Sequence, residues 1–294
     1  MLIISSFMKI EFRINEICKQ RGIALKKLAE GINIHPVSLS KLLGKDGNPT
    51  CETLSKIASY LQVDISELFI TKKSIIELNK WEIYDCNDVV TFRKLNQNYG
   101  DFSNMSTKYG VKLFDTHFIA SEILYMIAGF KDISIQKELL QENNPTKAKR
   151  RFRNGDYIKH WRKDWHKFNI EWMKFWIMQK YSQNLEWVNL LNSTKGKMIL
   201  EDSTMQTGVS SFYWGAKDIL KSKLVREKRR ELKQQNLSKE QIEQQIENLY
   251  PNVGNGYLQG VNMMGKLLTL LRDNNGVLDY TLPNDIFILG NKVE

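Results

Sequence analysis

The chain has 294 residues, 42% of them hydrophobic, and a formal net charge of +10. This length is enough for one large domain, or for a large domain with a small one. The basic balance favours a polyanionic partner such as nucleic acid or a phosphate-rich ligand.

Several classes of protein are excluded by what the chain lacks. Cys18, Cys51 and Cys86 lie far apart without CxxC spacing, which argues against a disulfide framework or a cysteine metal site. The four histidines also lack ligand spacing, and no dinucleotide-binding or Walker loop occurs. No window approaches ~20 apolar residues, and the start has no basic region typical of a signal peptide. We therefore expect a cytoplasmic protein with no metal, cofactor or membrane contact.

Residues 9–70 contain short amphipathic stretches with helix stop signals between them. Gly22 ends the first stretch, as a glycine beyond a helix C-terminus does. His35 can cap a later helix that has Pro36 at its first position, and Thr50 can cap the helix that follows. This pattern predicts a compact bundle of five short helices.

The spacing in this region resembles the helix-turn-helix of the Cro and lambda-repressor type. Leu28 and Ala29 fall in the first helix of that motif, and Asn33 takes the tight-turn position. In this family the second helix, here about 35–43, enters the major groove. The resemblance implies a homodimer on double-stranded DNA, whereas a bundle used only for protein contacts is the alternative. The residues expected to meet DNA are His35, Val37, Ser38 and Lys41.

The remainder of the chain reads as a linker followed by one large domain. Residues 71–88 lack a clear period, and residues 89–294 are rich in helices and aromatics. We expect strands at 89–95 and 197–202, a helix at 116–132 and a pair of helices at 161–194. The highly charged segment 221–249 predicts a solvated helix or helical hairpin, and contact with DNA or a partner chain is the alternative. The fold class is therefore mainly α: a small bundle, then a larger α-rich α+β domain with a few short strands.

Glu122 is the one carboxylate in the otherwise apolar or small run IASEILYMIAGF of residues 119–130. On a helix it would share a face with Phe118, Tyr125, Met126 and Gly129. Such neighbours partly desolvate the acid, and burying a carboxylate without a partner costs free energy. Either Glu122 performs chemistry or it forms a buried salt bridge to Arg or Lys.

Short motifs follow one another in order between residues 92 and 273. This ordered set resembles the NADAR family, also called YbiA-like. The matching positions are Phe102-Ser103-Asn104, Ser121-Glu122, Pro145, Ala148-Lys149, Lys180 to Asn184, Leu191, Thr194, Ile199-Leu200-Glu201, Trp214-Gly215, Gly260, Asn262, Gly265, Leu268 and Arg272.

The resemblance implies chemistry at a ribosyl N-glycosidic bond, with Glu122 and Glu201 as its acids. For Glu201, a surface acid at a strand end is the alternative. The other positions imply contacts to ADP-ribose, NAD or a related ribosyl nucleotide. For these residues, turn capping, core packing or a solvated basic face remain open. They are Ser103, Asn104, Ser121, Lys149, Arg153, Trp214, Gly215, Gly260, Asn262, Gly265 and Arg272.

Two departures from the family pattern bear on catalysis. Gly129 stands where the family usually has a lysine, and Ser211 stands where it usually has an aspartate. Three functions stay open. The first is a DNA-binding N-glycosidase that removes ADP-ribose from guanine in DNA, as an autoregulated antitoxin would. The second is a non-catalytic nucleotide-sensing regulator, and the third is an N-glycosidase of a riboflavin-pathway intermediate.

Overall fold

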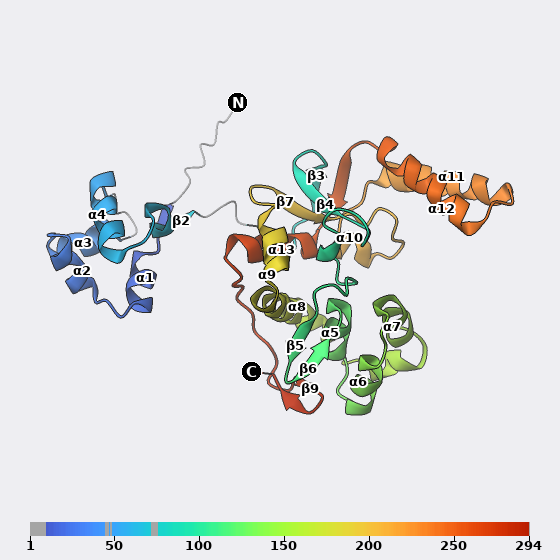
Figure 1. Cartoon of the computed structure of the whole chain (residues 1–294), viewed down its shortest axis with the longest axis horizontal. Helices are drawn as coiled ribbons and strands as arrows, with labels where there is room; N and C mark the ends of the chain where they lie inside the picture. The colour runs from blue at the N-terminus through green and yellow to red at the C-terminus, as the bar shows by residue number, and fades with distance from the viewer. Residues whose placement is uncertain (1–9, 45–46, 48, 72–75, 294) are drawn as a thin grey trace. The chain divides into compact units, whose positions relative to one another are not determined.

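The computed structural model describes residues 10–44, 47, 49–71 and 76–293 (Figure 1). The chain divides into two compact units between residues 75 and 76, which lies inside the stretch expected to be a linker. Each unit has its own hydrophobic core.

The N-terminal unit is a helical bundle closed by a small antiparallel ribbon. Its core includes Ile14, Leu28, Leu39 and Ile57, one from each helix. The ribbon joins the two ends of the unit, and its strands are too short to show an alternating pattern in the sequence. The elements are β1 (Ile10–Phe12), α1 (Ile14–Gln20), α2 (Leu25–Gly31), α3 (Pro36–Leu42), α4 (Cys51–Leu61), a 3₁₀ helix (Ile65–Leu68) and β2 (Phe69–Thr71).

The local signals expected to shape this unit are present. The His35 side chain accepts a hydrogen bond from the Val37 backbone N–H at 3.3 Å, and the Thr50 side chain accepts one from Thr53 at 3.2 Å. Asn33 has φ 58°, so it occupies the left-handed turn position predicted for it. The mainly α fold with a short helical bundle first is therefore confirmed.

The C-terminal unit contains short strands in pairs. β3 (Glu82–Asp85) runs antiparallel to β8 (Tyr257–Gly260), and β4 (Val89–Phe92) runs parallel to β7 (Met198–Glu201). β5 (Val111–Leu113) forms a hairpin with β6 (Thr116–Phe118), and β9 (Phe287–Ile288) pairs with β10 (Asn291–Lys292). The strands expected near 89–95 and 197–202 are therefore present as β4 and β7.

Helices surround these strands. They are α5 (Ser121–Ile127), α6 (Ile133–Leu140), α7 (Pro145–Phe152), α8 (Trp165–Gln183), α9 (Leu185–Asn192), α10 (Ser210–Trp214), α11 (Ile219–Gln234), α12 (Lys239–Leu249) and α13 (Met263–Asp273), with 3₁₀ helices at Gly100–Phe102, Gly155–His160 and Tyr250–Asn252. Residues of α5, α8 and α13 are central to one continuous apolar core.

The helix expected at 116–132 is shorter in the structure, because residues 116–118 form β6. Phe114 and Asp115 both have positive φ, which is the geometry of a tight two-residue hairpin turn. The usual Asn-Gly signal for that turn is missing from the sequence, so the hairpin was not predicted. As a result, Glu122 lies in the first turn of α5 rather than at the middle of a long helix.

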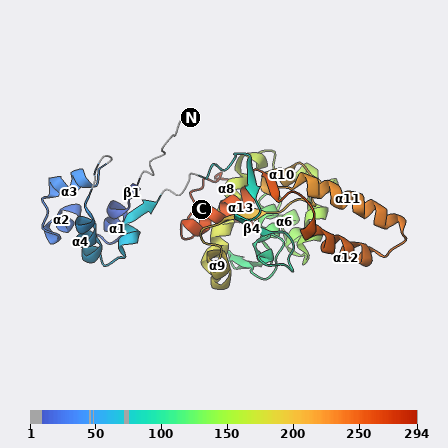
Figure 2. The same ribbon diagram turned by 90° about the horizontal axis from the view of Figure 1, so that it is seen from above.

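The charged segment 221–249 forms a helical hairpin, as predicted. α11 and α12 run side by side and project from the rest of the C-terminal unit (Figures 1 and 2). The hairpin has its own small core, which includes Val225, Leu232 and Ile246. Ion pairs from Glu247 to Arg93 (2.6 Å) and Lys94 (2.7 Å) connect it to the end of β4.

None of the helices in the described ranges has both the length and the apolar character needed to cross a membrane. The same residues contain no group of three His, Cys, Asp or Glu side chains placed to hold a metal ion.

Candidate functional site

A cavity of about 280 Å³ opens in the C-terminal unit where several of the sequence motifs converge. Its walls come from the segments around β4, α5, α7, α8, β7, α10 and α13, so residues distant in sequence meet there. Of the residues predicted from the sequence, seven line it: Ser103, Asn104, Glu122, Lys149, Arg153, Glu201 and Trp214.

Glu122 is 3% exposed and lies at the start of α5. Its backbone N–H donates to the Asn104 carbonyl at 2.8 Å, which fixes the start of the helix against the loop before it. One carboxylate oxygen, Oε1, lies 3.3 Å from Lys149 Nζ and 3.5 Å from Arg153 Nη2. Both distances exceed the 2.7–2.9 Å usual for a charged hydrogen bond. The two cations thus neutralise Glu122 without forming a hydrogen bond to Oε1 within the described chain.

This arrangement combines the two interpretations of Glu122 that the sequence left open. The acid is in ion pairs with basic residues, and it also faces a cavity together with both of its partners. Lys149 is in α7 and Arg153 caps its end, and Asn144 begins that helix by accepting hydrogen bonds from the Thr146 and Lys147 backbone N–H groups. A short, well-capped helix therefore delivers both cations to the acid.

Glu201 is half-buried at the end of β7 and faces the same cavity. Burial raises the pKa of its carboxyl group; Lys149 lowers the pKa, and the charge of Glu122 raises it further. Gln206 Nε2 donates to Glu201 Oε1 at 3.3 Å. The two acids expected to act together do share one cavity, and Lys149 interacts with both of them.

Other polar groups near Glu122 have no partner in the described chain. These are the Oδ1 atom of Asn104, the hydroxyl of Ser121 and the Nε atom of Arg153, all of them buried. The Ser103 hydroxyl, by contrast, accepts a hydrogen bond from the Met105 backbone N–H at 3.2 Å. Buried polar atoms without partners are uncommon, so their concentration here is typical of a ligand-binding site.

Aromatic rings form one side of the cavity. Trp214 meets Tyr125 edge to face, with ring centroids 5.8 Å apart. The Arg153 guanidinium lies over the Tyr125 ring at 5.3 Å. Trp214 is only partly buried, so its ring surface is available to stack on a planar group.

Asn262 and Arg272 do not belong to the cavity, and the expectation that they bind a ligand is corrected by their hydrogen bonds. The Asn262 side chain accepts from the Glu201 backbone N–H at 3.0 Å and donates to the Ile199 carbonyl at 2.9 Å. Arg272 is 2% exposed, and its Nη1 donates to Thr194 O, Thr194 Oγ1 and Lys197 O. Asn262 holds β7 in place, and Arg272 fixes the turn that precedes β7.

The three predicted glycines, Gly215, Gly260 and Gly265, are also structural rather than ligand-facing. A Cβ on Gly215 would lie 2.5 Å from the Glu201 carbonyl oxygen. A Cβ on Gly260 would lie 2.6 Å from the Gly215 carbonyl oxygen, so these two segments pack backbone to backbone. A Cβ on Gly265 would collide with the Ile199 carbonyl, which keeps α13 close to β7. These glycines place β7 and α13 so that Glu201 reaches the cavity.

The sequence did not single out several residues that line the cavity. Gln206 and Ser210 lie in the stretch STMQTGVSS, which was noted only as an insertion, and Met173 and Met264 lie in apolar helical runs. The remaining residues are Phe92, Arg93, Met105 and Tyr125. Apolar periodicity does not distinguish a cavity wall from a core position.

The second candidate surface is α3 of the N-terminal unit. Val37 is 56% exposed, and Ser38 and Lys41 are exposed as well, whereas Leu39 is buried. His35 is exposed and caps the helix. The residues expected to meet DNA thus share the outer face of the second helix of the motif.

Comparison with known families finds one match for each of the two units that carry these surfaces. Residues 13–74 match the Cro/C1-type HTH DNA-binding domain, and residues 91–274 match the NADAR domain. The second match covers more than half of the chain. The chain belongs to the NADAR family. It carries a helix-turn-helix DNA-binding domain in front of the NADAR domain.

Individual proteins add little to the family matches. No curated protein matches the chain. Among solved structures, the NMR structure of the E. coli protein YbiA is 26% identical, with a TM-score of 0.38. The similarity covers 44% of this chain and 72% of YbiA.

Gly129 and Ser211, where this NADAR domain departs from the family pattern, are packed against the rest of the chain and do not face the cavity. A Cβ on Gly129 would collide with the Trp161 ring, whose Nε1 donates to the Phe152 carbonyl at 2.7 Å. Ser211 is buried, and its hydroxyl donates to the Gly208 carbonyl. Neither position reaches the cavity, so Lys149 and Arg153 are the cations beside Glu122.

Proposed function

We propose that the NADAR domain hydrolyses the N-glycosidic bond between ADP-ribose and a guanine base of DNA. The observation that carries this proposal is the pair of acids, Glu122 and Glu201, facing one buried cavity beside two cations. A glycosidic bond that breaks through an oxocarbenium-like transition state needs a proton for the leaving base and negative charge near the ribose.

The environments of the two acids suggest a division of labour. The raised pKa of Glu201 suits a general acid that keeps its proton long enough to deliver it to the leaving nitrogen. Glu122 faces two cations and suits the role of holding a ribose hydroxyl and stabilising positive charge at the anomeric carbon. Water then adds its hydroxyl to that carbon, and its remaining proton restores the acid.

The other cavity residues suit the remaining parts of ADP-ribose. Lys149 and Arg153 can compensate the charge of the diphosphate while they hold Glu122. The Trp214 ring can stack on a base, and the unpartnered Oδ1 of Asn104 can accept from a base edge or a ribose hydroxyl. The helix-turn-helix would bind double-stranded DNA of the protein's own operon as a homodimer, as an autoregulated antitoxin requires.

The test uses purified full-length protein and its Glu122→Gln variant. Each is incubated with guanine-ADP-ribosylated single-stranded DNA, and the released ADP-ribose is followed by mass spectrometry. We expect release by the wild type and a rate lower by a factor of about 10²–10⁴ in the variant. Glu186→Gln is the matched control, because this exposed glutamate lies on α9 away from the cavity. Absence of release by the wild type would contradict the proposal.

A second function is favoured by Gly129 and Ser211, because neither position presents a side chain to the cavity. If the lysine and aspartate they replace are needed for turnover, the domain senses ADP-ribose or NAD without cleaving it. Calorimetry with ADP-ribose, together with the release assay, distinguishes the two: the sensor binds ADP-ribose, releases none from modified DNA, and changes its affinity for duplex DNA when the ligand is present. Release of ADP-ribose that depends on Glu122 would rule the sensor out.

A further inference from the structure

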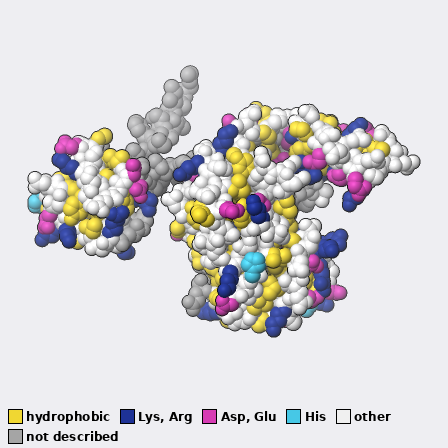
Figure 3. Space-filling model, viewed as in Figure 1, with side chains coloured by type: hydrophobic (Ala, Val, Ile, Leu, Met, Phe, Trp, Pro, Cys, Tyr) yellow, Lys and Arg dark blue, Asp and Glu magenta, His cyan; other side chains and the backbone are white. Residues whose placement is uncertain are grey.

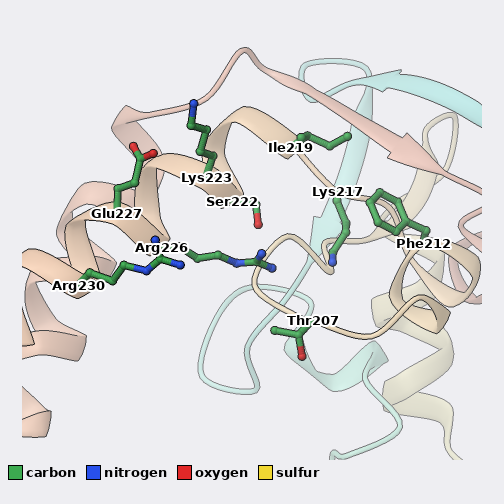
Figure 4. Close-up of a pocket in the computed structure, with 9 residues that line it drawn as sticks. All are labelled: Thr207, Phe212, Lys217, Ile219, Ser222, Lys223, Arg226, Glu227 and Arg230. Carbon is green, nitrogen blue, oxygen red and sulfur yellow. The ribbon is translucent and has the colours of Figure 1, made fainter.

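A second cavity, of about 410 Å³, lies at the base of the α11–α12 hairpin (Figure 4). One short segment contributes to both cavities: Gln206 and Trp214 line the first, and Thr207 and Phe212 line the second. The other wall of the second cavity comes from α11. Both walls belong to the parts of the chain that depart from the family pattern, namely the stretched segment before Trp214 and the hairpin insertion.

Four basic residues line this second cavity. Lys223 points away from the others (Figure 4), which leaves three cations that face it: Lys217, Arg226 and Arg230. Figure 4 shows Lys217 and Arg226 pointing toward one another, while the carboxylate of Glu227 points away from them. Lys217 is 4% exposed; burial lowers its pKa, and the charge of Arg226 lowers the pKa further. Two like charges held this way gain stability from an anion placed between them.

Neighbouring cations of α11 form ion pairs with carboxylates, whereas the three cations that face the cavity do not within the described residues. Arg229 pairs with Glu243, and Lys228 lies 3.0 Å from Glu231. In the part of the chain that the structure describes, no carboxylate makes an ion pair with any of the three cations of the cavity. Figure 3 shows basic and acidic side chains interspersed on the visible face of the hairpin. The unbalanced charge is therefore local to the cavity.

Aromatic rings adjoin these cations. Phe212 lines the cavity, with Lys217 Nζ 4.7 Å from its ring centroid. Phe212 also stacks on Trp81, with centroids 5.3 Å apart and planes 25° apart. Trp81 is 51% exposed, so the stack reaches solvent. Cations beside exposed aromatic rings are the usual means of holding a single nucleic-acid strand, with phosphates on the cations and bases on the rings.

We propose that the cavity of Lys217, Arg226 and Arg230 binds the phosphate backbone of a single strand of DNA whose modified base occupies the Glu122 cavity. The proposal rests on the proposed function, and it specifies that the substrate is a base within a strand rather than a free nucleotide. A single strand is favoured because a base inside a duplex cannot reach a buried acid without leaving the stack.

Binding is measured by fluorescence anisotropy of a labelled, unmodified single-stranded oligonucleotide on the full-length protein. Excess unlabelled duplex occupies the helix-turn-helix. R226A/R230A is compared with K233A/K239A, which removes the same charge from exposed hairpin positions that do not line the cavity. We expect R226A/R230A to weaken binding about tenfold and to lower the slope of log K against log salt by about 1. R226K/R230K should retain most of the affinity, because the backbone is read mainly as charge.

Equal losses of oligonucleotide affinity in R226A/R230A and K233A/K239A would overturn the proposal. It would also be overturned if R226A/R230A bound the oligonucleotide as the wild type does and lost only the ability of inorganic pyrophosphate to compete. A second assay separates this outcome from failure of the proposed function. Release of ADP-ribose is measured from an ADP-ribosylated guanosine mononucleotide and from an ADP-ribosylated oligonucleotide. We expect R226A/R230A to raise KM about tenfold for the oligonucleotide only. If neither substrate is cleaved by the wild type, the proposed function fails, and the binding assay still decides the inference.

Discussion

The NADAR domain contains two clusters of side chains with buried polar atoms, and they differ in how many of those atoms have a hydrogen-bond partner. The frame cluster consists of Thr194, Asn262, Thr269 and Arg272, and none of its buried polar atoms lacks a partner within the described chain. The cavity cluster consists of Asn104, Glu122 and Arg153, which line the cavity, and of Ser121 next to Glu122 in the chain, and each of these has a buried atom without a hydrogen bond in the described chain. Because both clusters contain family motif residues, a motif residue is assigned to structure or to ligand by its hydrogen bonds rather than by its identity.

The largest expected effect is on the frame cluster. Arg272→Met leaves three acceptors of the turn at residues 194–197 without their donor, so we expect the free energy of unfolding to fall by about 3–5 kcal/mol. Tryptophan fluorescence in denaturant measures it, because all seven tryptophans lie in the C-terminal unit. The exposed Arg150→Met should change stability by less than about 0.5 kcal/mol. Similar losses in the free energy of unfolding for Arg272→Met and Arg150→Met would show that the hydrogen bonds of Arg272 do not stabilise the domain.

The two asparagines give a matched pair. Asn262→Ala loses two hydrogen bonds to β7 and puts alanine at φ 55°, so we expect a cost of about 2–3 kcal/mol. The side-chain contact of Asn104 is a weak one, 3.8 Å to Met173 Sδ, so Asn104→Ala should cost less than about 1 kcal/mol. The affinity for ADP-ribose should fall more in Asn104→Ala than in Asn262→Ala. Calorimetry showing weaker binding only in Asn262→Ala would reverse the assignment.

A smaller contrast is expected between two hydroxyls. Thr269 Oγ1 accepts from the Ile199 N–H at 3.0 Å and donates to the Gly265 carbonyl at 2.8 Å. Thr269→Val should therefore cost about 1–2 kcal/mol in denaturant unfolding. The Ser121 hydroxyl has no such partner, and Ser121→Ala should leave stability within about 0.5 kcal/mol or raise it. A large loss in Ser121→Ala would show that its hydroxyl is part of the frame.

Lys180 belongs to neither cluster, and its expected effect is a dependence of stability on pH. It is 1% exposed, its Nζ donates to the Asp101 carbonyl at a long 3.4 Å, and burial lowers its pKa to about 7. The folded pKa is below the unfolded value of 10.5, so the folded state releases this proton first. The penalty for burying the charge is complete below about pH 7 and is relieved as pH rises toward 10.5. Stability should rise between pH 7 and 9, and Lys180→Met should abolish that rise.

Much of the fold could be predicted because its determinants are local. The caps at His35 and Thr50, the left-handed Asn33 and the charged hairpin each depend on a few adjacent residues. The β5–β6 hairpin could not be predicted, because its turn uses Phe114 and Asp115 instead of the usual turn residues.

The candidate site was predictable only in part, for a similar reason. Glu122 was identified because a lone acid in an apolar run is conspicuous in one dimension. The role of Arg272 depends on Thr194, which lies 78 residues away, and that contact is set by tertiary packing. The second cavity escaped notice because Lys217 and Arg226 come together only when α11 packs beside the segment before it.

The contact between Gly129 and Trp161 restricts the order in which this sequence can change. The Trp161 ring occupies the space that any side chain at position 129 would need, and its Nε1–H is tied to the Phe152 carbonyl. A lysine at position 129 can be accommodated only after Trp161 has been replaced by a smaller residue. Replacing Trp161 first removes a ring that packs on Phe130 at 4.9 Å. Each replacement made alone is therefore expected to lower stability, and a redesign that puts a side chain at position 129 should change Trp161 at the same time.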